Sequence, residues 1–207
     1  MPDLASRAFL LRAVLWLVIV FVAWAWLAPV LLLPVAWLTE PVLTALQPQA
    51  VAGVEASGKA AVDIVTRFDA SMLPARNQTP ERAHEIAFSV NALKYGYGLP
   101  LIVALTLAAE GVSTRRRVLC VLGGSVLVLA VQVWGVSFEA LLVLGRQLGP
   151  RVAEVLDFSP FAHEAVALGY QLGSLIFPPV LPVVWWGGCH LRLLVPAFRA
   201  PVPGGGD

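Results

Sequence analysis

The sequence predicts an all-α membrane bundle of four transmembrane helices with a small β-rich extracytoplasmic insertion between the first two helices. Of the 207 residues, 58% are hydrophobic and only 13% are charged, whereas a soluble domain carries roughly 25% charged residues. The apolar residues gather into four stretches, and alternating strand-like patterns fill the segment between the first two. The net charge of +1 supplies no basic surface of the kind that nucleic-acid binding needs.

The first predicted span covers residues 13–38 and contains no charged residue. A helix needs about 20 apolar residues to cross the hydrocarbon core, because each residue rises only ~1.5 Å. The stretch is also longer than the apolar part of a secretory signal, which holds about 7–15 residues. We therefore expect an uncleaved transmembrane helix that begins after a short N-terminal segment and kinks at Pro29 and Pro34.

The next two predicted spans differ in length and in polar content. The second, residues 95–110, is the shortest and ends at Glu110. The third, residues 118–144, contains Gln132 and Glu139. An ionisable side chain inside a membrane is costly, so Glu139 is a candidate for pairing or for proton handling.

The fourth predicted span, residues 165–188, carries signs of both helix packing and helix distortion. Gly169 and Gly173 form a small-xxx-small pair, which lets a neighbouring helix approach closely. Gln171 lies between them and could donate a hydrogen bond across that contact to the glutamine of the third span. Three prolines within residues 177–182 are expected to interrupt the helix, and a broken helix can line a transport path or be a simple kink.

The distribution of arginine predicts the orientation of the four spans. Lys and Arg near the ends of a span resist translocation, so arginine-rich ends and short loops stay in the cytoplasm. Arginines occur before the first span, in the loop 111–117 and after the fourth span, namely Arg7, Arg12, Arg115, Arg116, Arg117, Arg192 and Arg199. Both termini are therefore expected in the cytoplasm, the C-terminal one as a tail over residues 189–207, with residues 39–94 and 145–164 outside.

The segment between the first two spans is too long for a simple connection and too polar for another span. Period-two alternation predicts strands at residues 51–57, 60–68 and 86–90. We expect a three-stranded sheet that rests on the outer leaflet. A sheet this small is marginally stable alone, so it should pack against the helix ends or against another protein.

The stretch that follows the last predicted strand is the most unusual in the chain. Its two glycines permit a sharp turn, and its two tyrosines suit the headgroup level of a membrane. It is therefore either an interfacial anchor or a binding element for a peptide or partner protein. The candidate binding residues in this stretch and in the third span are Asn91, Lys94, Tyr95, Gly96, Tyr97, Gly98, Gln132, Trp134 and Glu139.

The charged residues of the spans have predicted partners. Glu139 lies toward the outer end of the third span, where it could pair with Lys94 or Arg146. Glu110 could pair with the arginines of the adjacent loop. These pairings compete with the hypothesis that Glu139 moves protons.

No catalytic, metal or cofactor motif stands out. Cys120 and Cys189 lie 69 residues apart, and no second cysteine or histidine lies near Cys120 at the spacing of metal ligands. Neither a zinc site nor a disulfide framework is therefore indicated. Cys189 and His190 are adjacent, but neighbouring residues on a helix point about 100° apart, so spacing alone makes no dyad. Haem, metal and nucleotide motifs are also missing from the sequence, and we expect no cofactor.

Residues 91–100, 132–136 and 167–182 together resemble the exosortase H-associated membrane proteins. The resemblance covers nearly the whole chain and implies four spans, a short external insertion and a place in the bacterial inner membrane. It also implies that the protein accompanies an exosortase, which sorts surface proteins bearing C-terminal anchoring signals. Exosortases resemble cysteine transpeptidases with outward-facing Cys, Arg and His, whereas both cysteines here are predicted near the cytoplasmic face.

The favoured hypothesis is therefore a non-enzymatic accessory subunit that binds a membrane partner, either an exosortase or its substrate. One alternative is an intramembrane enzyme that uses Glu139 or a cluster of Cys189, His190 and Arg192. Another is a transporter or channel component with a water-filled path past Gln132 and Glu139.

Overall fold

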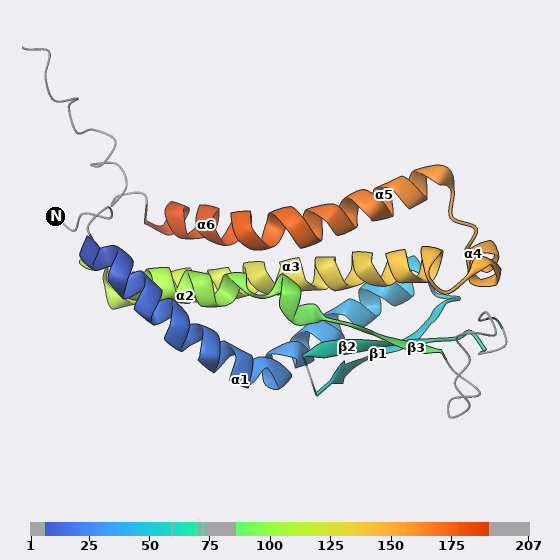
Figure 1. Ribbon diagram of the computed structural model, residues 1–207, viewed down its shortest axis with the longest axis horizontal. Coiled ribbons are helices and arrows are strands. Elements are labelled where there is room, and N and C mark those ends of the chain that lie inside the picture. The colour runs from blue at the N-terminus through green and yellow to red at the C-terminus, as the bar shows by residue number, and fades with distance from the viewer. Residues whose placement is uncertain (1–6, 59, 70–71, 73–85, 191–207) are drawn as a thin grey trace, which may run out of the picture.

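The computed structural model describes residues 7–58, 60–69, 72 and 86–190 (Figure 1). Three helical segments are long and apolar enough to cross a membrane: α1 (Arg7–Leu46), α3 (Thr114–Arg146) and the segment Pro160–Cys189. A shorter apolar helix, α2 (Gly98–Ala108), has 11 residues. The predicted Arg192 and Arg199, the C-terminal tail and residues 73–85 lie outside the described residues.

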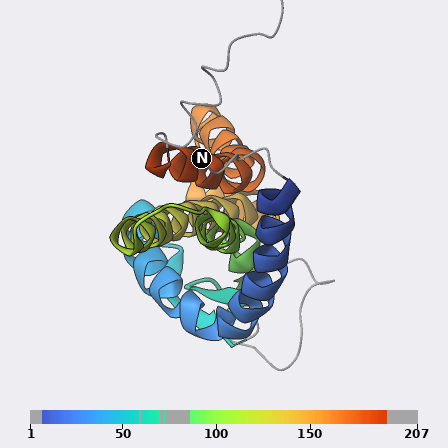
Figure 2. The same ribbon diagram turned by 90° about the vertical axis from the view of Figure 1, so that its left-hand side faces the viewer.

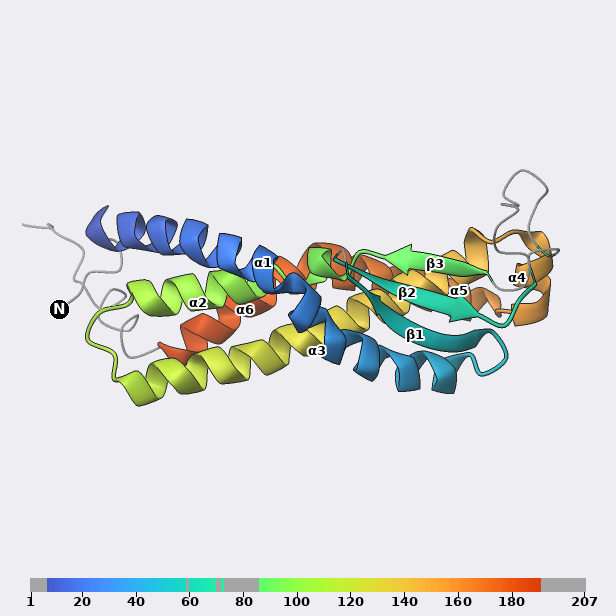
Figure 3. The ribbon, with the colours of Figure 1, turned by 90° about the horizontal axis from the view of Figure 1, so that it is seen from below.

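The helices divide the molecule into two halves along its long axis. In one half, α2 packs against α1, α3 and α6 (Phe177–Cys189), as the end-on view also shows (Figure 2). In the other half, the sheet, the C-terminal part of α1 and the helix α5 (Pro160–Gln171) gather on the C-terminal part of α3 (Figure 3). The chain therefore builds a helical half and a mixed half around one shared helix.

Helix α1 changes direction along its length (Figure 3). Pro29, Pro34 and Pro41 lie inside it, and each removes a backbone donor and crowds the preceding turn. The helix ends at Leu46, eight residues after the predicted end of the first span. Its last turns are stabilised by tertiary packing, since Leu43 is fully buried in the core that the sheet shares with α1.

The predicted three-stranded sheet is confirmed. Strands β1 (Val51–Ser57), β2 (Ala61–Thr66) and β3 (Ala87–Val90) are antiparallel in the order β1-β2-β3 and lie between α1 and α2 along the chain. Alternate residues of β2 are buried, as the period-two pattern requires. These side chains pack with α1 and α3 in a single core, so the sheet is supported by the helices.

The predicted break in the fourth span is absent from the described residues. Pro160–Cys189 is continuous, with a π-helical turn, η4 (Leu172–Ile176), joining α5 to α6. Pro178 and Pro179 lie in the first turn of α6, and each removes one backbone donor just where the helical hydrogen-bond pattern changes. The π turn ends just before these prolines and lets the helix continue.

The connection between α3 and α5 also contains structure that the sequence did not predict. A short helix, α4 (Pro150–Leu156), lies within the predicted loop 145–164, and α5 begins at Pro160. Ser159 caps α5 by accepting a hydrogen bond from the Ala162 backbone N–H at 3.2 Å.

Candidate functional site: the polar cluster between the sheet and the helices

A single 3-10 turn, η3 (Ala92–Tyr95), links strand β3 to helix α2. Asn91 caps it, because its Oδ1 atom accepts a hydrogen bond from the Leu93 backbone N–H at 3.1 Å. The turn brings Lys94 and Tyr95 to the C-terminal half of α3, where the predicted candidate Glu139 lies. Asn91 itself is exposed.

Both carboxylate oxygens of Glu139 are bound by residues of this turn. The Lys94 ammonium lies 2.6 Å from Oε1, and the Tyr95 hydroxyl donates to Oε2 at 2.8 Å. The pair is partly shielded, since the Lys94 side chain is 36% exposed and that of Glu139 is 19% exposed. Of the two predicted partners, Lys94 and Arg146, the structure pairs Glu139 with Lys94. The carboxylate thus attaches the turn η3 to α3.

The ring of Tyr95 is fully buried inside the protein, so it does not contact lipid headgroups as an interfacial anchor would. The ring packs on Gly135 of α3, where a Cβ atom would collide with it. The buried ring and the hydrogen bond to Glu139 together hold Tyr95 against α3.

The two glycines of the same stretch allow close contacts between helices. A Cβ atom on Gly96 would meet the side chain of Gln132, and one on Gly98 would meet the ring of Pro182 in α6. The Gln132 amide donates to the carbonyl oxygen of Ala92 at 3.3 Å. Gln132 thus holds the turn against α3, and Tyr97 between the two glycines remains half-buried.

The predicted helix-packing pair joins α5 and η4 to α3. A Cβ atom on Gly169 would collide with the ring of Phe138, and one on Gly173 would lie 3.0 Å from the Trp134 ring. Trp134, which is partly exposed, donates from Nε1 to the Gly169 carbonyl oxygen at 2.9 Å. Gln171 is exposed and takes no part in this contact.

Polar contacts also mark the opposite end of the helical half. Arg12 of α1 forms an ion pair with Glu110, so the partner of Glu110 is not one of the adjacent arginines as predicted. The Arg117 guanidinium donates to the Ala109 carbonyl oxygen at 2.6 Å. Along α3, Arg117 and Glu139 are 22 residues apart, about 33 Å of helix, which matches the hydrocarbon core of about 30 Å.

Comparison with known proteins gives one match. A family model described as exosortase H-associated membrane protein matches residues 4–192. The chain belongs to this family. No curated protein and no solved structure matches it.

In this exosortase H-associated membrane protein the two cysteines lie at the arginine-rich end. Cys189 of α6 packs on the small buried cluster that contains Cys120 of α3. His190 is buried, its Nδ1–H group donates to the Trp186 carbonyl oxygen at 2.9 Å, and its ring stacks on Trp186. Within residues 86–190, no hydrogen bond joins His190 to either thiol.

Three features were not predicted from the sequence, two at the polar cluster and one at the opposite end of the helical half. Gly135 was not singled out, although a glycine in the middle of a long helix signals a close approach. Tyr170 places its ring 5.5 Å from the Lys94 ammonium, a cation–π contact that has no sequence signal. The Arg12–Glu110 pair joins residues 98 positions apart, which only the tertiary structure brings together.

Proposed function

We propose that this protein is a four-span, non-enzymatic subunit of an exosortase system, with both ends in the cytoplasm, which binds the exosortase within the bacterial inner membrane. Family membership supports the association with an exosortase. The engaged carboxylate of Glu139 and the hydrogen bond of His190 Nδ1 to the Trp186 carbonyl oxygen favour a binding role over catalysis.

The connectivity of the two polar ends supports α2 as a fourth span. Helix α2 is only about 16 Å long, shorter than the hydrocarbon core. However, Lys94 before it bonds to Glu139 at one end, and Glu110 after it pairs with Arg12 at the other. Residues 95–109 therefore run from the Lys94–Glu139 pair at one polar end to the Arg12–Glu110 pair at the other.

The observation that carries the binding proposal is the uncovered apolar surface of α1. In the most apolar 18-residue stretch of α1, 11% of the residues are buried, compared with 33% in the corresponding stretch of α3. Trp26 is 88% exposed and lies 14 residues beyond Arg12, about 21 Å into the membrane. Tryptophan is enriched at membrane interfaces, not at this depth, and is a frequent anchor of protein contacts. We assign the exosortase-binding face to α1 around Trp26.

The candidate residues of the polar cluster divide into two roles in this proposal. Asn91, Lys94, Tyr97 and Trp134 keep exposed surface and are available to a partner or an exported peptide. The buried candidates Tyr95, Gly96, Gly98 and Gln132 shape that surface from inside.

In-membrane photo-crosslinking to a co-expressed exosortase tests the proposal. A photoreactive residue at Val22 or Val30, each one turn from Trp26, is expected to crosslink to the exosortase, and Trp26→Ala is expected to reduce the yield several-fold. The matched control is Val126 on α3, which is similarly exposed and apolar. Equal crosslinking from Val126, or none from α1, would show that α1 is not the binding face.

A further inference from the structure

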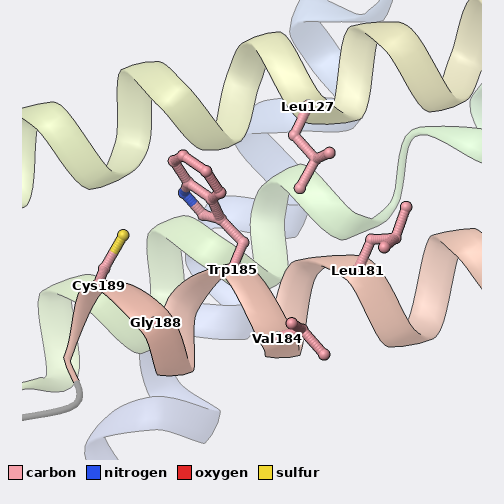
Figure 4. A pocket seen from close by; sticks show the side chains of 6 residues that line it. All are labelled: Leu127, Leu181, Val184, Trp185, Gly188 and Cys189. Carbon is pink, nitrogen blue, oxygen red and sulfur yellow. The ribbon is translucent and has the colours of Figure 1, made fainter.

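An apolar groove lies between α3 and α6 near the arginine-rich end of the molecule (Figure 4). Its volume is about 430 Å³, within the usual range for a small-molecule site. The lining is almost entirely apolar and consists of Leu127, Leu181, Val184, Trp185, Gly188 and Cys189. Nothing in the proposed exosortase contact, which uses α1, accounts for this groove.

The groove is built by a fixed tryptophan and two glycines. The Trp185 indole N–H donates to the Cys120 carbonyl oxygen at 2.9 Å, which holds the ring against α3. The ring lies where a Cβ atom on Gly123 would be, so this glycine lets it approach. A Cβ atom on Gly188 would meet nothing within 4 Å, so the groove is open beside this residue.

The length of the groove suits a lipid chain better than a protein helix. Along α6 the lining runs from Leu181 to Cys189, eight residues apart, about 12 Å of helix. This length fits within the depth of one leaflet, which is half of the hydrocarbon thickness of about 30 Å. A transmembrane helix of a partner would need a contact surface that crosses both leaflets.

Positive charge lies at the end of the groove where a headgroup would be. Arg116 lies one helical turn before Cys120, whose carbonyl oxygen accepts the hydrogen bond from the Trp185 indole of the groove. Between the described residues, ion pairs join Arg12 to Glu110 and Lys94 to Glu139, and neither pair involves Arg115 or Arg116. Basic side chains beside an apolar pocket between transmembrane helices are typical of sites for anionic lipid headgroups.

We propose that this groove binds one anionic phospholipid, with an acyl chain along Trp185 and Leu127 and the headgroup phosphate on Arg116. The groove supplies the apolar contact and the arginine supplies the charge preference. The proposal is independent of the exosortase contact on α1.

Fluorescence quenching by brominated lipids tests this site directly. The purified full-length protein is reconstituted in phosphatidylcholine vesicles containing either brominated phosphatidylglycerol or brominated phosphatidylcholine. Subtracting the quenching of a Trp185→Phe variant isolates the signal of Trp185. We expect about fivefold stronger apparent binding of the anionic lipid, because one arginine near the surface contributes about that factor.

Three variants separate a built site from general lipid contact. Arg116→Gln should abolish the preference, whereas Arg146→Gln, the same charge change at the far end of α3, should retain it. Gly188→Leu should fill the groove and reduce Trp185 quenching by both lipids, and circular dichroism checks the fold of each variant. Equal quenching of the wild-type protein by both lipids, or an equal effect of Arg146→Gln, would overturn the proposal.

Discussion

At the scale of single residues, the polar cluster stabilises the junction between the sheet and the helices. Glu139 is the one acidic residue of the predicted third span, and its two oxygens bind two residues of one short turn. Gly135, one helical turn before it, makes room for the ring of Tyr95. Glu139 thus binds the hydroxyl of Tyr95, and Gly135 makes room for its ring.

Replacing Glu139 with Gln should lower the free energy of unfolding by about 1 kcal/mol, because the partly exposed ion pair with Lys94 is lost. The amide oxygen of the glutamine can still accept the hydrogen bond from the Tyr95 hydroxyl. The measurement is thermal unfolding in detergent, with a decrease in Tm of about 2–4 °C. Glu154→Gln on an exposed face serves as the control and should change nothing. A variant that keeps full stability but loses function in surface sorting would instead support proton handling by Glu139.

Replacing Gly135 with Ala should destabilise the protein by about 1–3 kcal/mol, because the added methyl group overlaps the buried Tyr95 ring. Chemical denaturation would measure the loss. Gly188→Ala, also in a helix but with open space around it, should be neutral or slightly stabilising. Equal stability of the two variants would mean that Tyr95 can move away from α3 at no cost.

At the scale of elements, α3 is the helix on which the other elements assemble. Its C-terminal part contacts η3, α5 and the π turn η4, and its N-terminal part contacts α2 and α6. Small residues set these contacts, since glycines on α3 and on its neighbours lie under aromatic rings. In a membrane, such close packing replaces the hydrophobic effect as the main source of helix association.

The two glycines of the predicted packing pair should differ in sensitivity. The methyl group of Gly169→Ala would overlap the Phe138 ring. This variant should therefore lower the free energy of unfolding by about 1–3 kcal/mol. The Gly173→Ala methyl group would lie 3.0 Å from the Trp134 ring and 3.3 Å from the Gly135 Cα atom, so shifts of a few tenths of an ångström should absorb most of the loss of stability. Unfolding in detergent would rank the two, and the reverse order would contradict the observed packing of α5 on α3.

At the scale of the whole molecule, two ion pairs lie at the two ends of the helical half. Arg12–Glu110 is at the end that holds Arg115, Arg116 and Arg117, and Lys94–Glu139 is at the end with the sheet. The intervening length of α3 matches the hydrocarbon core, and α1 and α3 continue beyond it to support the sheet. We propose that the sheet faces the outside and that these three arginines face the cytoplasm.

Thiol labelling in intact cells with a membrane-impermeant reagent tests this orientation. A Ser57→Cys variant at the end of β1 should react, whereas Cys120 and Cys189 should not. Permeabilised cells provide the comparison for thiols protected by burial, because Cys120 is buried and Cys189 is half-buried. Reaction of Cys189 from outside would invert the proposed topology and would revive a sortase-like role for its thiol.

The sequence by itself determined the elements whose pattern is local. Long apolar runs predicted the spans and period-two alternation predicted the strands, because both signals arise from neighbouring residues in a single element. The glycine pair and the possible Lys94–Glu139 pairing were also predictable. Only the tertiary structure decided the continuity of the fourth helix, the burial of Tyr95 and the pairing of Arg12 with Glu110. These depend on contacts between distant segments, for which the order of residues along the chain carries no direct signal.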